Sequence, residues 1–124
     1  MAANKAVRFG PVALSATLTT NILNPPTVTG GTGVAGTNSA TYLLVRHLRI
    51  VNKTGSAATA SLWLGASAGN AAGTEVIAQG TSIPANSYFD WYGILRLDTA
   101  DYLVGGAGTA TALTIEGEGE IGIV

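Results

Sequence analysis

The chain has 124 residues, a length that fits one domain with a hydrophobic core. Only 10% of the residues are charged, the net charge is −1, and 47% are hydrophobic. This composition argues against a basic surface for nucleic acid, and the lack of cysteine excludes disulfides, thiolate metal ligands and cysteine nucleophiles. A surface so poor in charge predicts association with other protein, including other copies of the chain. A monomer with a Thr/Ser/Gly surface remains the alternative.

The residue pattern is typical of an all-β protein. β-Branched residues alternate with small ones, and clusters of Gly, Asn and Pro recur at short intervals, whereas no long stretch has helical periodicity. We therefore predict a single-domain antiparallel β-sandwich of about seven strands, and the spacing does not choose between a jelly-roll and an immunoglobulin-like topology. The expected strands are 12–23, 41–52, 58–65, 75–78, 87–97, 102–104 and 111–124.

Two segments are expected to lie outside the strands. Residues 1–10 are polar, carry Lys5 and Arg8, and are predicted to form an N-terminal arm ahead of a sandwich domain at 11–124. Residues 27–40 are rich in Gly and Thr and predict a flexible loop with little to bury. No apolar run approaches the ~20 residues of a membrane span, so no membrane contact is expected.

The last expected strand has the clearest alternation. Its apolar and glycine positions fall on one face, and Glu116, Glu118 and Glu120 fall on the other. Successive glutamates on one strand face repel each other, so this acidic row favours water or a basic partner. Arg46, Arg49 and Arg96, from this or another subunit, are candidates for that partner.

Aromatic residues mark a second surface. In the strand at 87–97, alternation places Trp91 on one face and Tyr92 on the other, and Trp63 adds a further ring on a different strand. One set of rings is expected in the core. The other set predicts a contact with protein, with a carbohydrate platform as the alternative.

The sequence contains short motifs whose context does not fit catalysis. Residues 31–36 match G-x-G-x-x-G, but no strand precedes and no helix follows. Residues 65–69 match G-x-S-x-G, but the only histidine, His47, precedes that serine, and no helix follows. A single histidine between Arg46 and Arg49 also makes a poor metal site. We expect no enzyme activity, no catalytic residue, no cofactor and no metal.

The chain from residue 48 onward resembles small structural proteins of tailed phages, above all head decoration (cement) proteins. Such a family implies a β-sandwich, often a homotrimer, seated on the major capsid protein, and it brings no catalytic residues. The resemblance is carried by the segments at 48–55 (LRIVNKTG), 60–65 (ASLWLG), 83–87 (IPANS), 91–93 (WYG), 95–97 (LRL), 101–103 (DYL), 113–115 (LTI) and 117–120 (GEGE).

We therefore expect a virion protein on the capsid surface, made in the host cytoplasm, that stabilises the head by binding the major capsid protein and itself. A tail, neck or fibre module and a carbohydrate-binding module are the alternatives. The candidate interface residues are Lys5, Arg8, Arg46, Arg49, Trp63, Trp91, Tyr92, Glu116, Glu118 and Glu120.

Overall fold

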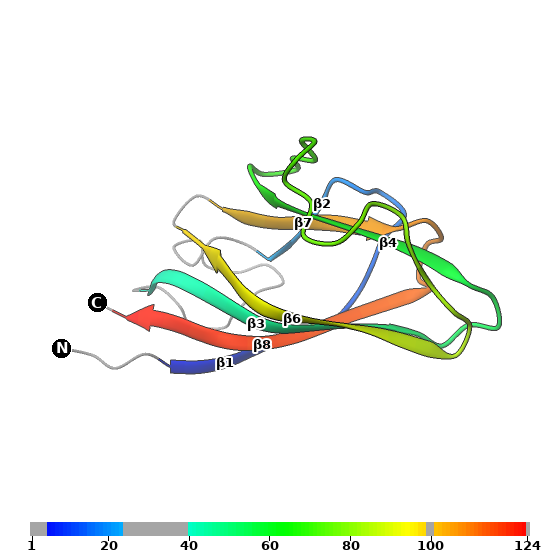
Figure 1. Cartoon of the computed structure of the whole chain (residues 1–124), viewed down its shortest axis with the longest axis horizontal. Coiled ribbons are helices and arrows are strands. Elements are labelled where there is room, and N and C mark those ends of the chain that lie inside the picture. Colours follow the sequence, from blue (N-terminus) through cyan, green and yellow to red (C-terminus); the bar gives the residue numbers. More distant parts are fainter. Residues whose placement is uncertain (1–4, 24–39, 99–100, 124) are drawn as a thin grey trace.

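The computed structural model describes residues 5–23, 40–98 and 101–123, and within these ranges every regular element is a strand. The described strands form two four-stranded antiparallel sheets that face each other (Figure 1). The predicted antiparallel β-sandwich is confirmed, with eight described strands where about seven were expected. They are β1 (Lys5–Ala13), β2 (Thr20–Leu23), β3 (Ala40–Asn52), β4 (Ala58–Gly65), β5 (Thr81–Ile83), β6 (Ser87–Leu97), β7 (Tyr102–Ala107) and β8 (Leu113–Ile123).

The strand order is that of a jelly roll. Sheet A has the order β1-β8-β3-β6, and sheet B has the order β2-β7-β4-β5. The pairs β1–β8, β2–β7, β3–β6 and β4–β5 are those of one long antiparallel hairpin. The further pairs β3–β8 and β4–β7 arise when that hairpin is rolled into two layers. Of the two topologies left open by the sequence, the structure has the jelly roll.

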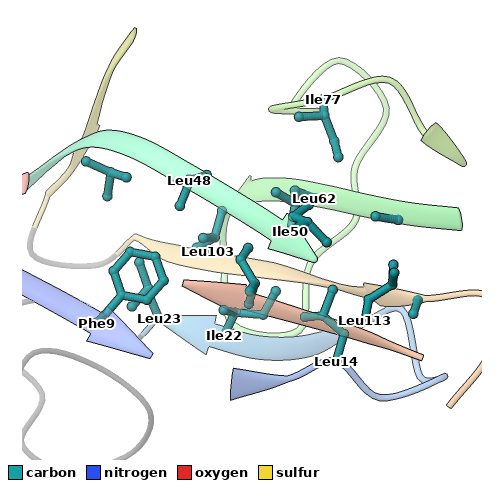
Figure 2. Packing of buried hydrophobic residues seen from close by; sticks show 14 of the residues in the cluster. Phe9, Leu14, Ile22, Leu23, Leu48, Ile50, Leu62, Ile77, Leu103 and Leu113 are labelled. Atoms are coloured by element: carbon teal, nitrogen blue, oxygen red, sulfur yellow. The ribbon is translucent and has the colours of Figure 1, made fainter. Parts of the chain in front are cut away.

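The core lies between the inner faces of the two sheets. Leu48 and Ile50 of β3 project toward Leu62 of β4 and Leu103 of β7, and all four side chains are almost fully buried (Figure 2). The residue that follows each of them in its strand faces outward, as the period of two requires. Alternating apolar residues therefore build the core, and the residues between them form the outer faces.

The strand expected at 102–104 runs on to Ala107 as β7, and three further expectations about element boundaries are wrong. The single strand expected at 12–23 is two strands, β1 and β2, in different sheets. The chain turns between them at Thr17, whose carbonyl oxygen accepts hydrogen bonds from both the backbone N–H and the hydroxyl of Thr20.

Residues 5–10 are not an arm, because they pair with β8. The strand expected at 75–78 is a single bridge at Glu75, and β5 follows later. The loop predicted at 27–40 lies outside the described residues except for its last position, which begins β3.

The glycines of β8 are explained by close packing on its inner face. A Cβ atom at Gly117 would lie 2.5 Å from the backbone oxygen of His47 and 2.6 Å from a ring carbon of Phe9. A Cβ at Gly119 would collide with the backbone oxygen of Leu44. The register between β3 and β8 shifts between Val45 and His47, at the level of these glycines. The alternation of Glu and Gly in β8 thus pairs an outer charged row with an inner row that has no room for side chains.

A buried amide fixes the end of β3. The side chain of Asn52 is fully buried, and its Nδ2 donates to the backbone oxygens of Ser56 at 2.9 Å and Ile83 at 3.0 Å. Its Oδ1 accepts from the backbone N–H of Thr54 at 3.0 Å and from the Thr54 hydroxyl at 2.7 Å. One side chain thereby joins sheet A to the turn after β3 and to the end of β5 in sheet B. In the part of the chain that is described, no helix is long and apolar enough to cross a membrane.

Candidate interaction surface

Most of the charged residues predicted as interface candidates meet on the outer face of sheet A. The register aligns Arg8 of β1 with Glu118 of β8, Glu118 with His47 of β3, and His47 with Tyr92 of β6. These four residues form one row across the whole sheet, because directly opposite residues share a face. The next row aligns Glu116, Arg49 and Asp90, so basic and acidic groups alternate from strand to strand.

Asp90 is the centre of this polar surface. Its Oδ1 accepts hydrogen bonds from Arg49 Nε at 2.7 Å and from His47 Nε2 at 2.9 Å, and its Oδ2 accepts from Arg49 Nη2 at 3.0 Å. The Arg49 hydrogen bonds, followed by that from His47, lower the pKa of the Asp90 carboxyl from 3.8 to about 2. The same pair raises the pKa of Arg49. Because Asp90 is ionised at neutral pH, its carboxylate is the acceptor and Nε2 of His47 is the donor.

The acidic row faces outward, as the alternation predicted. Glu120 binds Arg46 at 3.3 Å, and Glu118 lies with its Oε1 3.9 Å from Nδ1 of His47. Arg49 is opposite Glu116 in the register, but its hydrogen bonds go to Asp90 instead. The expectation that arginines of β3 meet the acidic row is therefore met within one subunit by the Arg46 pair.

A shallow pocket of about 190 Å³ opens on this face. Arg8 and Glu116 line it together with His47 and Glu118. Lys5 begins β1 opposite β8, but its side chain lies outside the described ones. The surface holds both signs of charge in close alternation and leaves no strong field of one sign to attract a highly charged ligand.

The outer edge of sheet A is apolar. Three large side chains of β6 are exposed: Tyr92 by 70%, Ile94 by 68% and Tyr88 by 57%. The ring of Tyr92 stacks on His47 with centroids 4.7 Å apart, and the guanidinium of Arg49 lies 4.5 Å from the centre of the Tyr88 ring. These contacts hold the two rings in place without covering them, so both remain available to a partner.

An apolar groove runs along the inner side of the same strand. It has a volume of about 410 Å³ and is lined by Trp91 and Leu95 of β6, by Leu64 of β4 and by Val76 of the segment between β4 and β5. Trp91 is partly buried against the core, which agrees with its predicted place on the face opposite Tyr92. The strand β6 therefore presents apolar side chains on both of its faces.

The prediction that Trp63 is an interface residue is wrong. Its side chain is only 1% exposed, so it has no surface to offer a partner. It points away from the core, because the adjacent Leu62 points inward, and it lies in register with Val104 of β7, which aligns with Asn21 of β2. The segment 66–73 crosses this row, since Asn21 binds Ser67 at 3.0 Å and the backbone N–H of Ala68 at 2.8 Å.

The alternation of Leu62, Trp63 and Leu64 is consistent with the observed face of Trp63, but the loop that covers that face gave no sequence signal. Figure 1 shows the segment between β4 and β5 above sheet B. By contrast, the exposure of Ile94 and the role of Asp90 were both missed. The signal for Ile94 was present in the alternation of β6, whereas the bonds of Asp90 depend on the register between β3 and β6.

The acidic side chains of the described residues do not assemble into a metal site. No group of three or more His, Asp or Glu side chains with suitable geometry occurs within 5–23, 40–98 and 101–123. Asp98 is bound to Arg96 at 2.7 Å, and Asp101 accepts the backbone N–H of Asp98 at 2.9 Å, which is a local turn. No protein-family model and no curated protein matches the chain.

Proposed function

We propose that this chain is a non-catalytic structural protein of a tailed-phage virion, a decoration protein that stabilises the head by binding the major capsid protein and other copies of itself. It would be made in the host cytoplasm and would act on the capsid surface. The proposal joins the resemblance of residues 48–124 to head decoration proteins with the surface features of the jelly roll.

The observation that carries the proposal is the apolar surface along β6. Tyr88, Tyr92 and Ile94 are exposed on one face of the strand, and the groove beside Trp91 lies on the other. Exposed apolar patches on a small soluble domain mark sites of protein contact. Aromatic residues are also enriched where protein interfaces are buried. A protein that works by contact needs such a surface and no chemical site.

The charged face of sheet A fits the same role. Arg49 and Asp90 neutralise each other, as do Arg46 and Glu120, so the face carries polar groups without strong net charge. A decoration protein repeated over a symmetric shell needs only modest affinity at each contact, because linked contacts multiply. The jelly roll supports the proposal only as a fold, since it also occurs in lectin domains.

Mass spectrometry of virions purified from the source of this sequence tests the proposal. A decoration protein is expected in a copy number comparable with that of the major capsid protein. A copy number of a few per particle would favour the alternative of a tail, neck or fibre module. Absence of the chain from virions would contradict both.

A carbohydrate-binding module is the second candidate, and the exposed ring of Tyr92 favours it. With Trp63 buried, the aromatic residues open to a sugar are Tyr88 and Tyr92 on the outer face, with Trp91 in the groove. Sugar binding should then appear on a glycan array and be lost in Tyr92→Ala. An array without binding would remove this candidate.

A further inference from the structure

We propose that β6 pairs, antiparallel and edge to edge, with β6 of a second copy of this chain, with Gly93 of each copy on the two-fold axis. The inference rests on the proposed function and specifies its self-contact. It would join sheet A of one copy to sheet A of the other in one continuous sheet.

The strand β6 is the longest of the four described edge strands. Edge strands expose unpaired N–H and C=O groups, and proteins protect them by making them short or by placing Pro, Lys or bulges in them. The edges of sheet B are short, with four residues in β2 and three in β5. The other edge of sheet A, β1, contains Pro11 and a register shift between Phe9 and Val12.

By contrast, β6 has eleven residues and contains neither Pro nor Lys. It pairs with β3 on one side, and no described strand pairs with it on the other. Its side chains alternate, with Tyr92 and Ile94 exposed and Trp91 and Leu95 against the core. Its register with β3 shifts at one place, where Gly93 and Ile94 lie between the partners of Val45 and His47. A long edge with apolar side chains that no described strand covers is a template for another strand.

The sequence of β6 is complementary to itself in one register. In a two-fold antiparallel pair, opposite residues share a face, so the axis must pass through a residue and not between two. With the axis at Gly93, Asp90 of one copy lies opposite Arg96 of the other. The two-fold symmetry produces this pair at two places. Opposite charges across a strand pair are stabilising, whereas like charges repel.

Neighbouring registers lose this match. An axis at Tyr92 would set Asp90 against Ile94, a charge against an apolar group. An axis at Ile94 would set Asp90 against Asp98, two like charges. The charge pattern of the strand therefore selects Gly93.

The apolar side chains fit the same register. Tyr92 and Ile94 become direct neighbours on the outer face, which covers the two most exposed apolar side chains of the strand. On the inner face Trp91 lies opposite Leu95, and both line the groove in each copy. Pairing would thus bring the two grooves together and exclude water from both.

The packing of Trp91 also explains why residue 93, at the axis, is a glycine. A Cβ at Gly93 would lie 3.0 Å from a ring carbon of Trp91, so the indole packs directly over this position. Arg96 has an exposed guanidinium that binds Asp98 and lies 4.4 Å from the ring centre of Tyr42. A guanidinium carries five N–H donors, so the donors of Arg96 that do not bind Asp98 can reach across the strand pair to the second copy.

Disulfide trapping tests the register, since the chain has no cysteine of its own. Tyr92→Cys and Ile94→Cys proteins are prepared separately, then oxidised alone and as a mixture. In the proposed register residues 92 and 94 of different copies have Cα atoms roughly 4.5–5.5 Å apart, within disulfide range. Two copies of residue 92 are diagonal neighbours about 7–8 Å apart, beyond that range.

Covalent dimers are therefore expected in the mixture and not in either variant alone. Ser82→Cys, on the exposed edge strand β5, is the matched control and should give none. Equal cross-linking in the single variants and the mixture, or none in any sample, would overturn the pairing. Sedimentation of the unmodified protein as a trimer with no cross-link between positions 92 and 94 would overturn it too.

Sedimentation velocity gives a second test that does not need cysteine. Ile94→Lys places a charge on the paired edge and should raise the dimer dissociation constant at least about tenfold, while the thermal stability of dilute protein is kept. Ser82→Lys should leave the dissociation constant unchanged. Equal dissociation constants in the two variants would contradict the pairing.

The outcome is separable from that of the virion experiment. A chain that cross-links as expected but is absent from virions would retain the pairing and overturn the proposed function. A chain abundant in virions whose positions 92 and 94 do not cross-link would retain the function and overturn the pairing.

Discussion

Replacing Trp63 by alanine should destabilise the fold without acting directly on any partner. The indole is buried on the outer face of sheet B beneath the segment 66–73, next to Val104. Removing a buried tryptophan side chain costs about 3–5 kcal/mol, through lost transfer energy and the cavity left behind. A domain of this size has a total stability of roughly 5–15 kcal/mol, so the loss is a large part of it.

The expected change in melting temperature follows from the chain length. With an unfolding entropy of about 2.1 cal/mol/K per residue, the loss corresponds to a fall in Tm of about 10–20 °C. Circular dichroism during heating measures it, and urea unfolding at 25 °C gives the free energy directly. Tyr92→Ala is the matched control. Its ring is mostly exposed, so in dilute protein the change should stay within about 1 kcal/mol.

The opposite pattern would refute this assignment of the two aromatic residues. If Trp63→Ala kept the melting temperature but lost binding to capsid or to itself, the indole would be a contact residue and the cover over sheet B would be wrong. If Tyr92→Ala unfolded the protein, the outer face of β6 would be part of the core.

Three further predictions concern particular contacts. Asn52→Asp should lower the free energy of unfolding at pH 7 by about 2–6 kcal/mol, because the backbone oxygens of Ser56 and Ile83 lose their donor, and an unchanged urea midpoint would contradict this. The pKa of Asp90 is lower in the folded chain, at about 2, than its ordinary 3.8, so its stabilising effect is full above about pH 4 and is lost as the pH falls through about 2. Urea midpoints across this range should therefore fall more steeply for the unmodified chain than for Asp90→Asn, and parallel curves would exclude the effect. Gly117→Ala should destabilise by roughly 1–3 kcal/mol through its clash with Phe9 and the backbone of β3, measured by the same unfolding assay, and a neutral result would show that β3 can move away.

The sequence predicted those parts of the fold where period-two alternation is strong. Residues 58–65 and 87–97 were expected as strands with the bounds that the structure has. The acidic row of β8 was expected on the outer face and lies there. In these segments each residue has a clear apolar or polar character, so the faces follow from the strand geometry alone.

The N-terminal third was predicted poorly because its turn has no Gly or Pro. Ser15 and Thr20 share a hydrogen bond of 2.7 Å between their hydroxyl groups, and Thr17 caps the turn with its carbonyl oxygen. These residues also suit a strand, so their alternation suggested one continuous element. Hydroxyl side chains that bond to nearby backbone make such turns without a distinctive sequence.

The candidate surface was only partly predictable for a different reason. Its composition was visible in the sequence, but the pairing of Asp90 with Arg49 depends on the register of strands that are 41 positions apart. The topology was likewise open, because a jelly roll requires pairs between the two ends of the chain. Long-range pairing is the information that alternation does not contain.

The edge of β6, which no described strand pairs with, is the feature on which the proposed self-contact depends most, and amide hydrogen exchange measures its occupancy directly. The amides of β6 that point away from β3 should be protected in concentrated protein and exchange rapidly on dilution, while Ile94→Lys should show rapid exchange at both concentrations. Protection that is independent of concentration, or absent at every concentration, would contradict a surface that is occupied by another copy of the chain.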